Sequence, residues 1–152
     1  MEEYTLIRKV GVWAGVSTGL TLILFGLTYE FIFRNLFGFQ PAAFSMWSNT
    51  RSFAVENKTL IIFLGVIIAP ICEEVFFRGG IFKNFSQNGY ILYGIFFSSL
   101  FFASAHFDLL SFPVYFVFGI LLALTYSKTN SIVPSMIAHA VNNAFAFYLL
   151  YA

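Results

Sequence analysis

The sequence has very few charged residues. They make up 10% of its 152 residues, whereas a soluble globular domain carries about 25%. The chain is therefore too poor in charged residues to be a soluble globular protein. Hydrophobic residues account for 59% of the chain, and the mean hydropathy is +0.82. Such a composition also excludes an intrinsically disordered chain, which would need low hydrophobicity and a high net charge.

Cysteine and net charge are scarce as well. The one cysteine, Cys72, excludes a disulfide framework and a zinc cluster built from cysteines. The formal net charge of +1 gives no basic patch for nucleic acid. The abundant residue is phenylalanine, with 22 copies. Together these features predict a small protein that crosses a membrane several times.

Five hydrophobic segments are long enough or nearly long enough to cross a bilayer core of about 30 Å as helices. They are residues 10–29, 59–82, 91–106, 112–127 and 132–151. The last four are joined by short connections, which make consecutive helices antiparallel neighbours. The predicted fold class is all-α, a polytopic membrane helical bundle of about five transmembrane helices.

The first segment resembles a signal peptide at its start, where Arg8 and Lys9 precede the apolar run. No small-residue cleavage site follows, so a retained helix is predicted. Gly11, Gly15 and Gly19 share one face and favour close packing against another helix of the same chain. Residues 35–58 form a polar and aromatic connection. The distribution of Lys and Arg slightly favours a cytoplasmic N-terminus.

Three charges lie inside the second hydrophobic segment: Glu73, Glu74 and Arg78. On insertion scales a charge at a helix centre costs about 2.5–3.5 kcal/mol, so intramembrane charges usually have a function. Glu74 and Arg78 are four residues apart and are predicted to form a structural ion pair. Glu73 lies about 140° away from Arg78 around the helix and remains a free carboxylate. Pro70, one turn earlier, lacks an N–H and is predicted to leave the Val66 carbonyl without its usual partner.

The chain has two histidines, and both lie in hydrophobic segments. His106 ends the third segment, and His139 shares a face of the fifth with Asn143. If Glu73 joins them, it can act as general base on a water molecule, with His106 holding that water. His139 and Asn143 can then stabilise the oxyanion of a scissile amide. Glu73, His106, His139 and Asn143 are therefore the candidate catalytic residues.

A divalent metal such as zinc is the alternative use of the same side chains. Glu73, His106 and His139 supply the two histidines and one carboxylate of a catalytic zinc site. Their spacing differs from the HExxH signature, in which both histidines lie on one helical turn. The sequence leaves two possibilities open, catalysis without a cofactor and catalysis with a metal.

Three short motifs carry a family resemblance. They are EEVFFRG at residues 73–79, FASAH at 102–106 and HAVNN at 139–143. In this order, and on separate hydrophobic segments, they resemble the EExxxR, FxxxH and HxxxN motifs of the CPBP family. These are intramembrane proteases that include CAAX prenyl endopeptidases and bacteriocin-processing or self-immunity proteins, and some are described as metalloproteases. The resemblance implies that residues 59–152 form a catalytic helical core, preceded by a helix and interfacial loop in residues 1–58.

The resemblance implies an enzyme, an intramembrane endopeptidase in which Glu73 activates water. Its expected substrate is a membrane-embedded or lipidated protein or peptide, with a partner subunit as a further possibility because the chain is short. The expected location is the plasma membrane of a prokaryote. Two alternatives remain: a scaffold or bacteriocin self-immunity protein without proteolysis, and a proton carrier that uses the intramembrane Glu and His residues.

Overall fold

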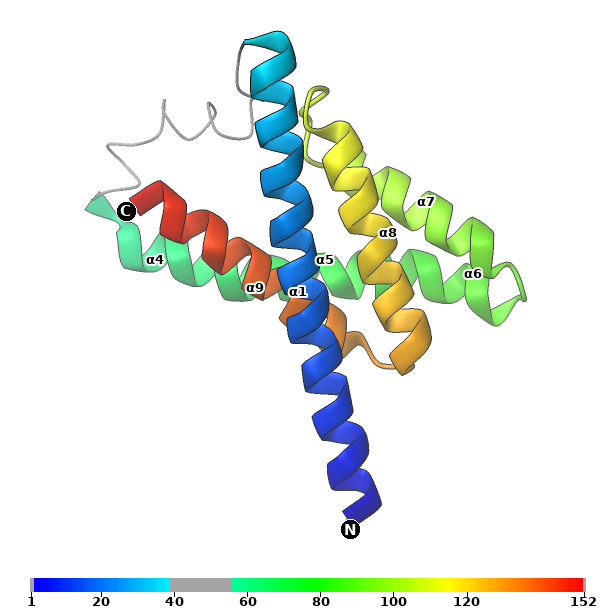
Figure 1. Cartoon of the computed structure of the whole chain (residues 1–152). Helices are drawn as coiled ribbons and strands as arrows, with labels where there is room; N and C mark the ends of the chain where they lie inside the picture. The colour runs from blue at the N-terminus through cyan, green and yellow to red at the C-terminus, as the bar shows by residue number, and fades with distance from the viewer. Residues whose placement is uncertain (1, 39–55, 152) are drawn as a thin grey trace.

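The computed structural model describes residues 2–38 and 56–151, with the backbone alone for residues 2–10. The described part contains helices and no strand, which confirms the all-α prediction (Figure 1). The elements in chain order are α1 (Glu2–Phe37), α4 (Lys58–Phe63), η1 (Leu64–Ile68), α5 (Ala69–Glu74), η2 (Val75–Phe82), α6 (Lys83–Gln87), α7 (Ile91–Ser104), α8 (Phe112–Thr129) and α9 (Ile132–Tyr151).

Four of the described helices are long and apolar enough to span a membrane. They are Gly11–Phe37, Lys58–Gln87, Phe112–Thr129 and Ile132–Tyr151. The third predicted segment is shorter than expected, because α7 has 14 residues and ends at Ser104. At 1.5 Å per residue it extends only about 21 Å. The bundle therefore has four candidate spans and one shorter apolar helix, and His106 lies in the turn that follows this shorter helix.

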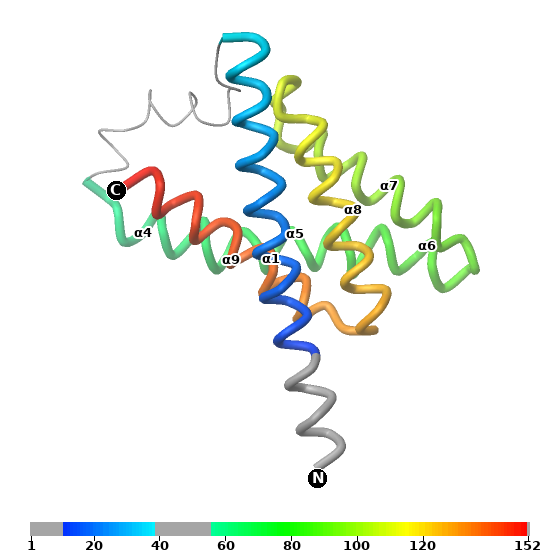
Figure 2. The backbone as a smooth tube through the Cα atoms, viewed as in Figure 1, coloured from blue at the N-terminus to red at the C-terminus, as the bar shows by residue number. Residues whose placement is uncertain are grey.

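The second predicted segment is one continuous helix from Lys58 to Gln87, longer than residues 59–82 (Figure 2). Two of its parts, η1 and η2, are π-helical. π-Helical turns contain one extra residue and occur frequently at functional sites. The three intramembrane charges lie at the end of α5 and within η2, so a π-helical segment stands on each side of the two glutamates.

The first helix packs against α9 through its glycine face. A Cβ atom built on Gly15 would lie 2.7 Å from the Pro134 carbonyl oxygen, and one on Gly19 would lie 2.8 Å from the Val141 Cβ. Only glycine permits this close approach of two backbones. Gly11 lies at the edge of the contact, where an added Cβ atom would lie 3.5 Å from Pro134 Cγ. The prediction that these glycines pack within the chain is confirmed.

The remaining helices surround the middle of the long helix. Consecutive helices contact each other as their short connections predict: α6 with α7, α7 with α8, and α8 with α9. At the crossing of α7 and α8, a Cβ atom on Gly119 would lie 2.7 Å from the Ser99 Cα. Buried rings and aliphatic side chains form the core between them, including Phe77, Phe102 and Leu122.

Several sequence predictions concern residues that the structure describes only in part. The connection predicted for residues 35–58 lies mostly outside the described residues, although α1 extends through Phe37 and α4 begins at Lys58. Exposed large hydrophobic side chains are frequent on the described helices. Trp13, Leu92 and Phe76, for example, are 71%, 79% and 62% exposed. Such outer surfaces suit contact with lipid.

Candidate active site

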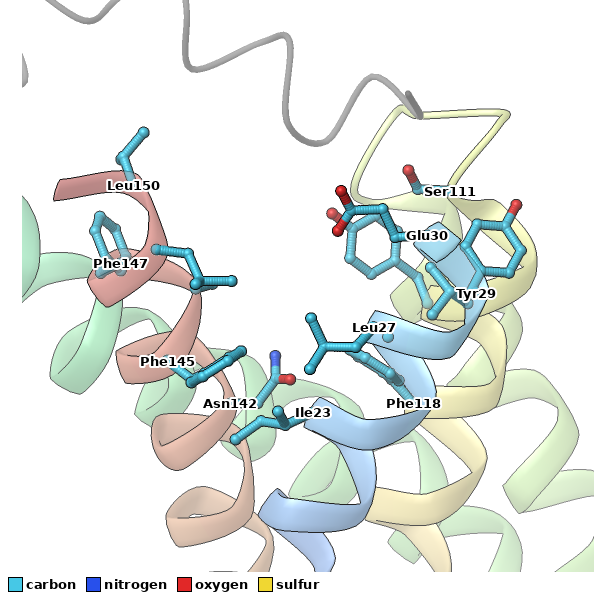
Figure 3. Close-up of a pocket in the computed structure, with 15 residues that line it drawn as sticks. Ile23, Leu27, Tyr29, Glu30, Ser111, Phe118, Asn142, Phe145, Phe147 and Leu150 are labelled. Carbon is cyan, nitrogen blue, oxygen red and sulfur yellow. The ribbon is translucent and has the colours of Figure 1, made fainter. Parts of the chain in front are cut away.

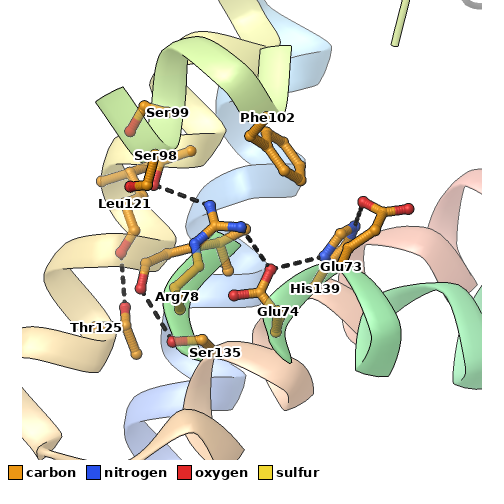
Figure 4. Close-up of polar contacts among 12 residues, drawn as sticks. Glu73, Glu74, Arg78, Ser98, Ser99, Phe102, Leu121, Thr125, Ser135 and His139 are labelled. Carbon is orange, nitrogen blue, oxygen red and sulfur yellow. Dashed lines mark hydrogen bonds and ion pairs between the residues drawn. The ribbon is translucent and has the colours of Figure 1, made fainter. Parts of the chain in front are cut away.

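A fully buried ion pair forms the base of the site (Figure 4). Arg78 Nη1 donates to Glu74 Oε1 at 2.9 Å, and both side chains are completely inaccessible. The second guanidinium nitrogen donates to the Gly119 carbonyl oxygen at 3.0 Å, so the pair also links the long helix to α8. The Phe102 ring covers the guanidinium at 4.7 Å. The predicted pairing of Glu74 with Arg78 is present.

Glu74 has a second partner that the sequence did not indicate. His139 Nδ1 lies 3.0 Å from Glu74 Oε1 and is buried. A carboxylate only accepts hydrogen bonds, so the imidazole must donate from Nδ1. This bond fixes both the orientation of the ring and the nitrogen that carries the proton, as buried carboxylates commonly do for histidine.

The opposite nitrogen of the same ring faces Glu73. His139 Nε2 lies 3.8 Å from Glu73 Oε2, on the side of the imidazole away from Glu74 (Figure 4). Glu73 Oε2 is buried and has no hydrogen-bond partner in the described structure. The Glu73 side chain as a whole remains 32% exposed. The two neighbouring glutamates thus lie on opposite ring nitrogens of one histidine, Glu74 fully buried and Glu73 partly exposed.

His106 approaches this group from the turn after α7. Its Nδ1 lies 2.8 Å from the Phe102 carbonyl oxygen, and its ring stacks on Tyr115 at a centroid distance of 4.0 Å. The Phe102 ring contacts both imidazoles, with its centroid 4.8 Å from that of His106 and 5.5 Å from that of His139. Phe102 is thus the shared wall between the two histidines.

Asn143 binds the backbone of the long helix. Its Nδ2 donates to the Gly65 carbonyl oxygen at 2.9 Å. In the π-helical register Ala69 N–H bonds to the Leu64 carbonyl, five residues earlier. The next acceptor, Gly65, would then need the N–H of Pro70, which proline lacks. The freed carbonyl that Asn143 satisfies is thus at Gly65, one residue before the position expected from α-helical spacing.

The candidate residues gather around one region, but not as one metal site. Glu73 and His139 face each other, His106 adjoins through Phe102, and Asn143 lies one helical turn after His139. Among the described residues, no group of three or more His, Cys, Asp or Glu side chains is placed to hold a metal ion. Glu73, His106 and His139 do not form such a group, and a metal takes no part in the mechanism that we propose.

Two neighbours of the site were not assigned a role from the sequence. Tyr115 stacks on His106, and Asn142 contacts Asn143 through a 3.4 Å hydrogen bond. Tyr115 had no distinguishing signal, since aromatic residues make up 21% of the chain. Asn142 had a weak one, because it lies about 60° from His139 around the same helix.

Comparison with known proteins places the chain in a family. A family model described as "Type II CAAX prenyl endopeptidase Rce1-like" matches residues 55–145. The chain is 29% identical over 141 residues to the "Membrane-embedded CAAX protease MroQ" of Staphylococcus aureus (strain USA300), a match that covers 88% of this chain and 55% of that protein. It is 31% identical over 91 residues to the "Putative membrane peptidase YdiL" of Bacillus subtilis (strain 168). This match covers 60% of this chain and 37% of that protein.

The chain thus spans about half or less of the length of these curated relatives. No solved structure matches it. The family match includes all three motif regions, and several apolar helices make the chain an integral membrane protein. With more than half of its 152 residues matched, the chain belongs to the Rce1-like family of type II CAAX prenyl endopeptidases.

Proposed function

We propose that this chain is an intramembrane endopeptidase in which Glu73 activates the attacking water. The observation that carries the proposal is the placement of His139 between two carboxylates. Its Nδ1 lies 3.0 Å from Glu74, and its Nε2 lies 3.8 Å from Glu73. Glu74 is neutralised by Arg78, which leaves Glu73 as the carboxylate available for chemistry.

In the proposed reaction Glu73 takes a proton from water while the resulting hydroxide attacks the scissile carbonyl carbon. His139 shares or returns that proton through Nε2, because Nδ1–H is held by Glu74. The proton then passes to the leaving nitrogen as the carbon–nitrogen bond breaks. The products are a new carboxyl terminus and a new amino terminus.

Asn143 contributes to stabilising the tetrahedral oxyanion in this proposal. An amide nitrogen has two hydrogens, and the bond to Gly65 uses one of them. The other hydrogen is available to the developing negative charge. His139, when it carries the transferred proton, is a second donor. His106 is proposed to orient the water through its Nε2, since its Nδ1 faces the Phe102 carbonyl.

The proposed substrate is a membrane-embedded or lipidated protein or peptide in the plasma membrane of a prokaryote. Support comes from the family match and from the two bacterial relatives, both named as membrane proteases or peptidases. The N-terminus is proposed to face the cytoplasm, and association with a partner subunit is a further proposal.

The test compares the N-termini of membrane proteins in bacterial cells that express the wild type or Glu73→Gln. Wild type should generate N-termini that the variant does not, because the amide cannot accept the proton of water. Glu56→Gln, at an exposed position outside the site, is the matched control and should behave as wild type. If wild type and Glu73→Gln yield the same set of N-termini, the proposed function is wrong.

A further inference from the structure

An apolar cavity of about 200 Å³ lies between α1, α8 and α9 (Figure 3). Its walls include Leu27, Phe118 and Phe145, and Asn142 lies at its floor as drawn. Glu73, His106, His139 and Asn143 are not among its lining residues. The cavity is therefore distinct from the catalytic group, although it adjoins that group at two points.

The first point of contact is Tyr115 on α8. Its ring lines the cavity and also stacks on His106 at 4.0 Å, so one side chain separates the two spaces. The second point is Asn142 on α9. It lines the cavity and immediately precedes Asn143. A ligand in the cavity would thus lie beside the second and third motifs together.

These two contact residues have unused hydrogen-bonding groups. Among the described residues, the Tyr115 hydroxyl has no hydrogen-bond partner. Asn142 makes one long bond, in which Nδ2 donates to Asn143 Oδ1 at 3.4 Å. Ser111 Oγ, at the other end of the cavity, is buried without a partner. Polar groups in an apolar membrane environment cost free energy until something binds them.

We propose that this cavity binds an apolar peptide segment of the substrate, and that Asn142 and Tyr115 hold its backbone beside the catalytic group. The proposal deepens the proposed function and rests on it. An amide and a phenol together offer donors and acceptors, which is what a backbone N–H and C=O require. The apolar walls suit the side chains of a segment taken from the membrane.

The charge at the other end of the cavity favours a peptide over a phospholipid headgroup. Glu30 lines that end with a side chain that is 19% exposed, and Ser111 lies beside it (Figure 3). A carboxylate repels an anionic phosphate but accepts a backbone N–H or a cationic side chain. Its ion-pair partner Arg34 is 56% exposed and is not among the lining residues.

The test measures binding separately from cleavage. The full chain carrying Glu73→Gln is reconstituted in phosphatidylcholine vesicles with a leucine- and alanine-rich peptide that bears a benzophenone group. After irradiation, the labelled residues are identified by mass spectrometry. Labels should fall on cavity residues of α1, α8 and α9. Labels confined to outward-facing residues such as Phe76 or Leu92 would overturn the proposal, as would equal labelling of the cavity by a benzophenone phospholipid.

Substitutions in the same Glu73→Gln background test the two named residues. Asn142→Ala and Tyr115→Phe should each raise the peptide concentration for half-maximal labelling several-fold and up to about tenfold, the effect of losing one hydrogen bond. Tyr115→Phe keeps the stacked ring and so preserves packing. Asn88→Ala and Tyr93→Phe, at exposed positions away from the cavity, should leave labelling unchanged.

Unchanged half-maximal labelling in both Asn142→Ala and Tyr115→Phe would contradict the assignment of these residues. This measurement uses a catalytically inactive background, so it does not depend on whether wild type cleaves anything. If the peptide binds in the cavity but no N-termini depend on Glu73, the proposed function is contradicted and this inference is not. If Glu73-dependent cleavage occurs but the peptide labels residues outside the cavity, this inference is contradicted and the proposed function is not.

Discussion

His139 donates from Nδ1 to Glu74 over 3.0 Å, and the accepting oxygen is the same one that receives the Arg78 guanidinium at 2.9 Å. One buried carboxylate oxygen thus connects an arginine of the long helix to a histidine of α9. Glu74 is fully buried and supports the site, whereas its neighbour Glu73 is a partly exposed carboxylate. The two glutamates of the EExxxR motif should therefore respond differently to the same substitution.

Arg78→Met should destabilise the protein strongly. Removing one partner of a buried ion pair leaves an uncompensated charge and costs about 3–5 kcal/mol. Arg34→Met provides a matched control, because Arg34 also pairs with a glutamate four residues away but is 56% exposed. It should cost less than about 1 kcal/mol. Thermal unfolding in detergent, followed by circular dichroism, measures both. Equal losses would contradict the structural role of the buried pair.

Glu74→Gln and Glu73→Gln should separate stability from chemistry. Glu74→Gln removes the countercharge of Arg78, so the unfolding temperature should fall markedly. Glu73→Gln changes a partly exposed side chain without a hydrogen bond at its buried oxygen, and stability should stay within about 0.5 kcal/mol of wild type. The same unfolding assay tests the pair. A large loss for Glu73→Gln would show that both glutamates are structural.

Gly15→Ala should destabilise the contact between α1 and α9. Its Cβ would lie 2.7 Å from the Pro134 carbonyl oxygen, and relief requires the two helices to separate. Overpacking of this kind costs about 1–3 kcal/mol. Gly11→Ala is the control, since its Cβ would make an ordinary 3.5 Å contact and alanine favours a helix over glycine by about 0.5–1 kcal/mol. The two variants should thus shift the unfolding temperature in opposite directions.

Asn143→Leu should lower stability even when catalysis is already absent. The substitution leaves the partly buried Gly65 carbonyl without its donor, and the cost should be at most that of a fully buried unsatisfied acceptor, about 1–3 kcal/mol. Measuring unfolding in the Glu73→Gln background removes any effect of substrate turnover. Asn88→Ala, whose amide bonds to the Asn84 carbonyl at an exposed position, should change stability little. No difference between the two would mean that Asn143 has no structural role.

Much of this fold follows from composition and spacing. The fifth predicted segment, residues 132–151, coincides with α9, and the four-residue spacing of Glu74 and Arg78 identifies their pair. Both depend on local periodicity, which a sequence displays directly. The free role of Glu73 relative to Arg78 also follows from helical angles, although its catalytic role remains a prediction.

The rest depends on contacts between distant segments. The bond between His139 and Glu74 joins residues 65 apart, and no local pattern shows which glutamate a histidine will meet. The length of the third helix was overestimated. The apolar sequence continues to His106, whereas α7 ends at Ser104. The identity of the freed carbonyl was off by one residue because η1 is π-helical, a register that hydrophobic periodicity does not reveal.

The two π-helical segments also change the rotation of the side chains about the axis of the long helix from one part to the next. Each extra residue turns the chain by about 100° relative to an uninterrupted α-helix. The six residues of α5, which include both glutamates, therefore have a different rotation about the helix axis than uninterrupted α-helical spacing would give them. Deleting one residue from η1 should keep the pair of Glu74 with Arg78, because both lie after the deletion, and should rotate the preceding turns relative to α9. The directions of the two carboxylates therefore depend on the number of residues in the π-helical segments as well as on the side chains themselves.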